Sequence, residues 1–72
     1  MSEKTIVIHV RFAPDGSVAE IGERPAGLSA QQWYSYLSEQ AGAMFQTLAG
    51  GRGVFRLGRE QVDALKENAA LQ

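Results

Sequence analysis

Apolar residues in the middle of the chain recur at the spacing of a single long helix. In residues 28–51, they fall on one face when each residue advances by about 100°. The residues on this face are Ala30, Trp33, Tyr34, Leu37, Ala41, Met44, Phe45 and Leu48. Ser29 followed by Gln32 predicts a capping box at the start, and Gly50 with Gly51 predicts the end. We therefore predict one long helix that packs its apolar face against the rest of the fold.

Residues 5–12 alternate between apolar and other side chains, which is typical of a strand. One face carries Ile6, Ile8, Val10 and Phe12, and the other carries Thr5, Val7, His9 and Arg11. Proline, aspartate and glycine in residues 13–16 predict a turn, and residues 17–23 continue as a weaker strand. A loop of residues 13–16 keeps Glu20 off the apolar face. This register pairs Val10 with Ala19, Ile8 with Ile21, His9 with Glu20 and Arg11 with Val18.

The C-terminal part of the chain predicts a short strand and a last helix. Residues 54–57 alternate as a strand, directly after a glycine-rich joint. Residues 60–70 repeat apolar side chains at helical spacing through Val62, Leu65 and Ala69. The predicted element order of the whole chain is therefore ββαβα.

This order indicates an α+β fold, a two-layer sandwich of helices on a sheet. The most apolar strand, residues 5–12, belongs at the centre, so the three-stranded antiparallel sheet takes the order 2-1-3. The long helix packs on one face of the sheet, and the short C-terminal helix follows. The pattern leaves open whether that last helix covers the second face. We expect residues 1–72 to form one small domain with a frayed, polar start at residues 1–4.

The composition excludes several kinds of chemistry. The chain of 72 residues contains no cysteine, which excludes disulfides, thiolate metal sites and thiol nucleophiles. It contains one histidine, so a zinc site would have to rely on carboxylates. We therefore expect no metal and no cofactor.

The charge balance bears on the choice of partner. Seven basic and eight acidic residues give a formal net charge of −1, which provides no overall attraction to nucleic acid or to an anionic membrane. Residues 1–12 contain only a short apolar run, interrupted by His9 and Arg11, which fits neither a signal peptide nor a membrane span. We expect a cytoplasmic protein that binds no membrane and for which a protein is a better partner than nucleic acid.

The second face of the predicted sheet carries the candidate functional residues. It combines His9, Glu20, Val54 and Arg56. Arg52, Arg56 and Arg59 fall within eight positions and could hold phosphates or the carboxylates of a partner. The simpler alternative is that they are solvated charges that protect an edge strand.

Two further residues are single candidates. Tyr36 lies on the flank of the apolar stripe of the long helix, where an exposed aromatic residue suits an interface. His9 could act as a general base oriented by Glu20, but the predicted fold places no nucleophile beside it, and an exposed histidine paired with a carboxylate is the more ordinary reading.

These observations favour a small non-catalytic protein-binding or regulatory module. It would act through the edge or the open face of its sheet and would hold a protein partner or a second copy of itself as a homodimer. The candidate partner-binding residues are Tyr36, Arg52, Val54, Arg56, Arg59, His9 and Glu20. The alternative is a nucleic-acid-binding accessory protein that uses Arg52, Arg56 and Arg59. The third choice is a small enzyme or enzyme subunit centred on His9.

Overall fold

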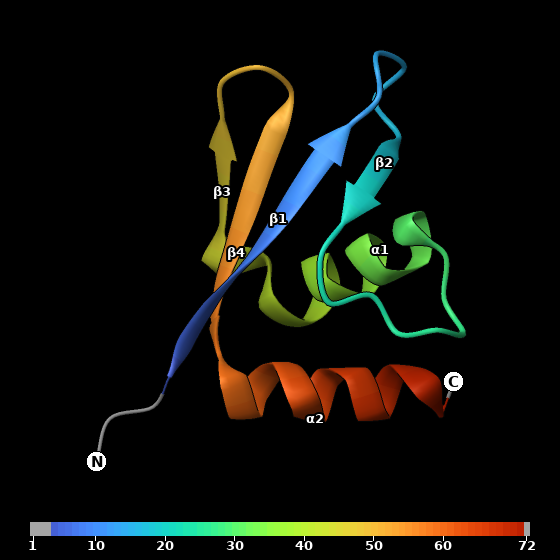
Figure 1. Cartoon of the computed structure of the whole chain (residues 1–72), viewed down its shortest axis with the longest axis vertical. Helices are drawn as coiled ribbons and strands as arrows, with labels where there is room; N and C mark the ends of the chain where they lie inside the picture. The colour runs from blue at the N-terminus through green and yellow to red at the C-terminus, as the bar shows by residue number, and fades with distance from the viewer. Residues whose placement is uncertain (1–3, 72) are drawn as a thin grey trace.

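A four-stranded antiparallel sheet and two helices make up the fold in a computed structural model of the chain (Figure 1). The structure describes residues 4–71. The elements are β1 (Thr5–Phe12), β2 (Val18–Ile21), α1 (Ala30–Ala41), the short 3₁₀ helix η1 (Gly42–Met44), β3 (Phe45–Leu48), β4 (Arg52–Gly58) and α2 (Arg59–Ala70). The strands lie in the order β2-β1-β4-β3. The α+β class with an antiparallel sheet is confirmed, whereas the prediction of three strands is wrong.

The apolar strand β1 lies inside the sheet, with the bounds that its alternation predicts. It pairs with β2 on one side and with β4 on the other. The strand predicted at 54–57 is part of β4 and is antiparallel to β1, as expected. It does not lie at the edge of the sheet, however, because β3 pairs with its outer side.

The predicted long helix ends early. The capping box of Ser29 and Gln32 is present, but α1 stops at Ala41. Gly42 follows, and glycine inside a helix costs about 1 kcal/mol relative to alanine. The next strand, β3, is then joined to β4 by Gly50 and Gly51, which have φ values of 81° and 71°. The two glycines therefore shape a hairpin turn and do not terminate a helix.

The register of the first hairpin differs from the prediction by two residues. The observed pairs are Val10 with Ile21, Arg11 with Glu20 and Phe12 with Val18, with an irregularity between the last two pairs. The loop takes in Ser17, because the Asp15 carboxylate accepts hydrogen bonds from the N–H of Ser17 (2.9 Å) and from its hydroxyl (2.6 Å). A shift of two residues leaves most side chains on their predicted faces, since the strand repeat is two. Val18 is the exception, because the irregularity turns it to the buried face.

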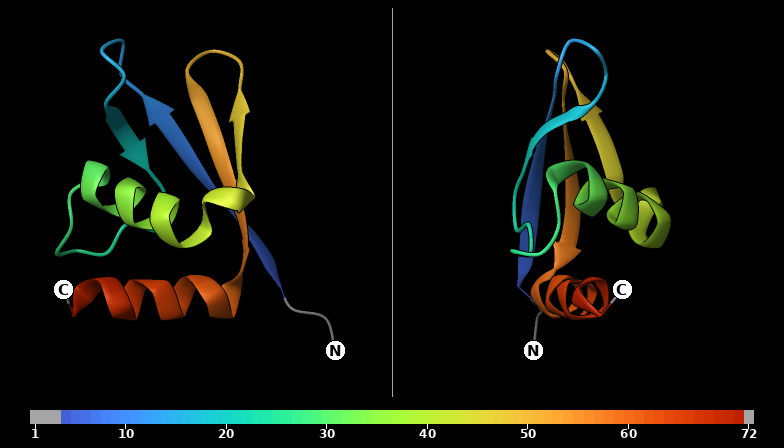
Figure 2. Two further views of the ribbon diagram at one scale, coloured as in Figure 1. Left: turned by 180° about the vertical axis from the view of Figure 1, so that it is seen from behind. Right: turned by 90° about the vertical axis from the view of Figure 1, so that its right-hand side faces the viewer.

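Helix α1 packs on one face of the sheet and α2 lies below α1 at the end of the sheet, so neither helix covers the other face, which is open (Figure 2). The largest fully buried side chains are Trp33, Phe55, Ile8, Leu37, Val10 and Val62. Trp33 also donates its indole N–H to the carbonyl of Gly22 (3.0 Å), which ties α1 to the segment after β2. The predicted apolar residues of the last helix are buried beside α1. The frayed start predicted for residues 1–4 lies outside the described residues except for Lys4, which is exposed.

Candidate functional site

The candidate site is the open face of the sheet, which carries mostly charged and polar side chains. Because alternate residues of a strand point to the same side, the strand pairing defines the members of this face. They are Thr5, Val7, His9 and Arg11 from β1, Glu20 from β2, Gln46 and Leu48 from β3, and Arg52, Val54 and Arg56 from β4. Of the predicted candidate residues, the fold brings together His9, Glu20, Arg52, Val54 and Arg56.

Val54 is the one buried side chain of the open face. Only 2% of it is exposed, although no helix packs over this face. His9 and Gln46 lie opposite it on the two neighbouring strands, so their side chains flank it on both sides. Val54 therefore supports the polar face from beneath and is not accessible as an apolar anchor.

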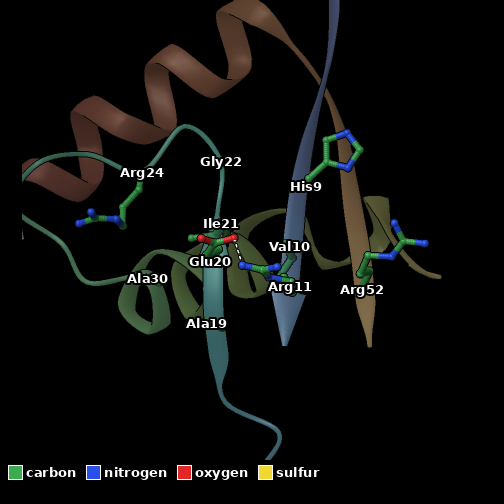
Figure 3. Close-up of a pocket in the computed structure, with 10 residues that line it drawn as sticks. All are labelled: His9, Val10, Arg11, Ala19, Glu20, Ile21, Gly22, Arg24, Ala30 and Arg52. Atoms are coloured by element: carbon green, nitrogen blue, oxygen red, sulfur yellow. Dashed lines mark hydrogen bonds and ion pairs between the residues drawn. The ribbon is translucent and has the colours of Figure 1, made fainter. Parts of the chain in front are cut away.

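The half of the open face on β1 and β2 is neutralised by an ion pair. Arg11 donates a hydrogen bond to the Glu20 carboxylate, and both side chains are exposed (Figure 3). The prediction that His9 lies opposite Glu20 is wrong, because the register places Arg11 opposite Glu20. On the β2 side, the carbonyl of His9 instead accepts a hydrogen bond from the N–H of Gly22. An exposed ion pair contributes at most about 1 kcal/mol to stability, but it does cancel the local charge.

The half on β4 and β3 carries two arginines with no carboxylate partner among residues 4–71. Arg56 donates a hydrogen bond to Oε1 of Gln46, and Nε of Arg52 lies 3.4 Å from the carbonyl oxygen of Ala49. Both acceptors belong to β3 or to the turn that follows it. Figure 3 shows the Arg52 side chain turned away from β1. Both guanidinium groups therefore lean toward the outer strand β3.

Arg59 is separated from the other two arginines. It begins α2, and its guanidinium donates hydrogen bonds to Glu23 (2.8 Å) and Asp63 (2.9 Å). Lys66 donates a further bond to Glu23 (2.7 Å). The hydrogen bonds from Arg59 and Lys66 to the Glu23 carboxylate lower the pKa of Glu23 to about 2. Arg59 thus holds the segment after β2 against α2, and the structure divides the predicted three-arginine cluster.

Tyr36 lies on the helical side of the molecule and not on the open face. It is half-buried, and its ring stacks on Trp33 with a centroid distance of 6.2 Å and an interplanar angle of 15°. Together with Leu28, Gln32 and Ala69 it lines a groove of about 250 Å³. A partner that touches Tyr36 therefore does not touch the open face through the same flat surface.

A larger hollow, of about 680 Å³ and open to solvent, lies over β1 and β2 (Figure 3). Its charged and ionisable lining residues are His9, Arg11, Glu20, Arg24 and Arg52. Arg24 stands beyond β2 in Figure 3, and its guanidinium donates a hydrogen bond to the carbonyl of Leu28 (2.5 Å). The hollow thus carries more positive than negative groups and is suited to negatively charged groups of a partner.

Sequence reasoning missed Gln46 and Leu48, because they were assigned to the long helix. A signal for the correct assignment was present. Gly50 and Gly51 separate two stretches that can each be read as a strand, and a glycine pair between strands predicts a hairpin. The apolar residues Phe45 and Leu48 fit a helix equally well, which concealed this signal.

The charges of the described residues are divided between the two sides of the molecule. The open face carries three arginines and one carboxylate, Glu20. The helices carry exposed acidic residues at Glu39, Glu60, Asp63 and Glu67.

Within residues 4–71, neither helix has the length and apolarity needed to cross a bilayer, and no three His, Asp or Glu side chains gather to hold a metal ion. Comparison with known proteins finds no matching family model, curated protein or solved structure.

Proposed function

We propose that this chain is a small non-catalytic module that binds an acidic region of a protein partner through the open face of its sheet. The observation that carries the proposal is the pair Arg52 and Arg56. Both are exposed on the same face, and neither forms an ion pair with a carboxylate in the part of the chain that the structure describes. Arginine binds carboxylates through charge-assisted hydrogen bonds, so a partner with suitably placed acidic side chains would find two ready donors.

The open face supports a protein partner better than a nucleic acid. Proteins that bind single strands combine a positive groove with aromatic side chains on which bases stack. Among the described residues, no Phe, Tyr or Trp belongs to the open face, and only two of the three predicted arginines lie on it. The exposed carboxylates of the helices would repel a polyanion that extended past this face. A nucleic-acid-binding accessory protein therefore remains the second candidate.

Two features of the open face favour a non-catalytic role. Catalysis by His9 would need a group that orients its ring and a reacting group beside it. Glu20, the expected orienting group, is paired with Arg11, and Val54 is opposite His9 in the sheet. His9 is thus better suited to contact a partner than to abstract a proton.

Binding of two charge-matched probes tests this proposal. A fluorescent poly-glutamate peptide and a fluorescent oligothymidine of equal charge are titrated with the protein at about 50 mM salt, where surface charges are incompletely screened. We expect the peptide to bind more tightly than the oligothymidine. Arg52→Glu and Arg56→Glu should each weaken peptide binding about tenfold or more, the loss expected from one charge-assisted contact.

The control is Lys4→Glu, which makes the same change in charge. Lys4 is exposed and precedes β1 at the end of the sheet opposite Arg52. We expect this variant to change peptide affinity about threefold at most, through the net charge alone. Tighter binding of the oligothymidine, lost in both arginine variants, would support the nucleic-acid alternative instead. Equal effects of all three variants would contradict a specific role for Arg52 and Arg56.

A further inference from the structure

The two edges of the sheet differ in how well they are protected from pairing with another strand. At the β2 edge, the N–H of Val18 donates to Oε1 of Gln31 in α1 (3.0 Å), and the pairing of β2 with β1 is irregular. Irregular pairing and covered donors are devices that prevent edge-to-edge association. The β3 edge, Phe45–Leu48, contains no charged residue, no proline and no irregular pairing with β4. It is therefore the edge that can accept a strand.

The backbone of β3 presents a donor on this outer side. A methyl group placed on Gly53 of β4 would lie 3.2 Å from the carbonyl oxygen of Gln46, so this carbonyl points toward β4. The C=O and N–H groups of one trans peptide point in opposite directions. The N–H of Thr47, which belongs to the same peptide as the Gln46 carbonyl, consequently points away from β4 and outward from the sheet.

The side chains around β3 define the kind of strand that fits. On the open face, Arg52 and Arg56 lean toward β3, as described above. A strand added to β3 would lie two strand spacings from β4, roughly 10 Å, which an arginine and a glutamate can span between them. On the helical side, Phe45 of β3 pairs with the buried Phe55 and is itself only partly buried, so it offers apolar contact. One side of the new strand therefore needs carboxylates, and the other needs apolar residues.

We propose that an extended segment of a protein partner, with acidic and apolar residues in alternation, pairs with β3 as a fifth strand. Main-chain hydrogen bonds to β3 supply affinity, and the alternating side chains supply specificity. This inference rests on the proposed function, because it uses the same two arginines. A second copy of the chain fits this edge less well. The sequence of β3, Phe-Gln-Thr-Leu, has no carboxylate to offer to Arg52 and Arg56.

The test uses the peptide acetyl-Glu-Val-Glu-Val-Glu-Val-amide and a version of it that is N-methylated at every second residue. In an extended strand these N–H groups all point to the same edge, the one that would face β3. The methyl groups remove main-chain donors but keep every charge. Titration followed by NMR should show binding of the first peptide, with slowed hydrogen exchange at the amide of Thr47. The N-methyl peptide should bind about tenfold more weakly or worse, the equivalent of one to two lost hydrogen bonds.

Two variants of the protein test the main-chain donor of β3 in the same way. Thr47→Pro removes the outward N–H and should abolish peptide binding, whereas Thr47→Ala keeps the N–H and should bind as the wild type does. Proline at the outer side of an edge strand is compatible with the sheet. If Thr47→Pro does not fold, the comparison of the two peptides on the wild-type protein still decides the outcome.

The possible results separate this inference from the proposed function. If both peptides bind equally and Arg52→Glu weakens both, the open face binds acidic proteins without strand addition, and the inference about β3 is overturned alone. If neither peptide binds, or if both bind without regard to Arg52, the proposed function fails together with it. Sedimentation that shows a dimer of the wild type and a monomer of Thr47→Pro would assign the β3 edge to a second copy and would also overturn the inference.

Discussion

Glu23 offers the sharpest test of what holds the segment after β2 in place. Its carboxylate accepts hydrogen bonds from Arg59 (2.8 Å) and Lys66 (2.7 Å), two residues of α2. The pKa of Glu23 falls from its ordinary 4.5 to about 2, mainly because of the hydrogen bond from Arg59 and then that from Lys66. At about 1.4 kcal/mol per pKa unit, this fall sets a ceiling of about 3.5 kcal/mol on the stabilisation.

The real contribution is smaller, because water screens all three groups. The side chain of Glu23 is 31% exposed, and those of Arg59 and Lys66 are 37% and 33% exposed. Exposed ion pairs contribute up to about 1 kcal/mol each, so we expect Glu23→Gln to lower the free energy of unfolding by about 1–2 kcal/mol at pH 7. Asp63→Asn is the control, because Asp63 forms only the more exposed pair with Arg59, and it should cost about 0.5 kcal/mol at most.

The pH dependence of this difference follows from the direction of the pKa shift. A carboxyl whose pKa is lower in the folded than in the unfolded protein stabilises the fold above the unfolded pKa, here 4.5. The stabilisation is lost as the pH falls from 4.5 toward 2. Urea denaturation of wild type and Glu23→Gln at several pH values should therefore show curves that converge in this window. An undiminished difference at the acid end, or no difference at pH 7, would refute the reasoning.

Two further predictions concern the core and the sheet. Trp33→Ala should lower the free energy of unfolding by about 3–5 kcal/mol, because Trp33 is fully buried. The control Ser35→Ala, at an exposed residue of the same helix, should change it by about 0.5 kcal/mol at most. Equal shifts in the melting temperature of the two variants would contradict the packing of α1. Gly53→Ala should cost about 1–3 kcal/mol and loosen β3, because the new methyl would lie 2.3 Å from the ring of Phe45. Gly42→Ala, where a methyl meets nothing within 4 Å, is the control, and melting that is the same for both glycine variants would show that the ring moves aside freely.

Local signals in the sequence predicted the local structure well. The alternation of β1, the capping box of Ser29 and the apolar spacing of α2 each depend on neighbouring residues, and each is present in the structure. The end of α1 was missed because Phe45 and Leu48 satisfy the helical and the strand period alike. There, pairing with β4, a non-local interaction, decides the outcome.

The candidate site was predicted in part, for a related reason. The side of the sheet on which His9, Glu20 and Arg56 lie follows from strand alternation and survives a shift of two residues in register. The same shift changes the partner of Glu20 from His9 to Arg11, because ion pairing across strands depends on the register itself. Arg59 was grouped with Arg52 and Arg56 by proximity in sequence, but the change from strand to helix at Gly58 directs it elsewhere.

The hydrogen bond from Val18 to Gln31 limits how many molecules the sheet can join. A polymer built by strand pairing needs two available edges in every subunit, so that each one added leaves a place for the next. With β2 closed by a side chain of α1, each molecule has a single available edge in residues 4–71. The strand addition proposed for β3 would occupy this edge, and association by strand pairing would then stop at one partner per chain. In the proposed pairing, the amide of Gln31 would thus limit each chain to one added strand, and its loss would expose a second edge to pairing.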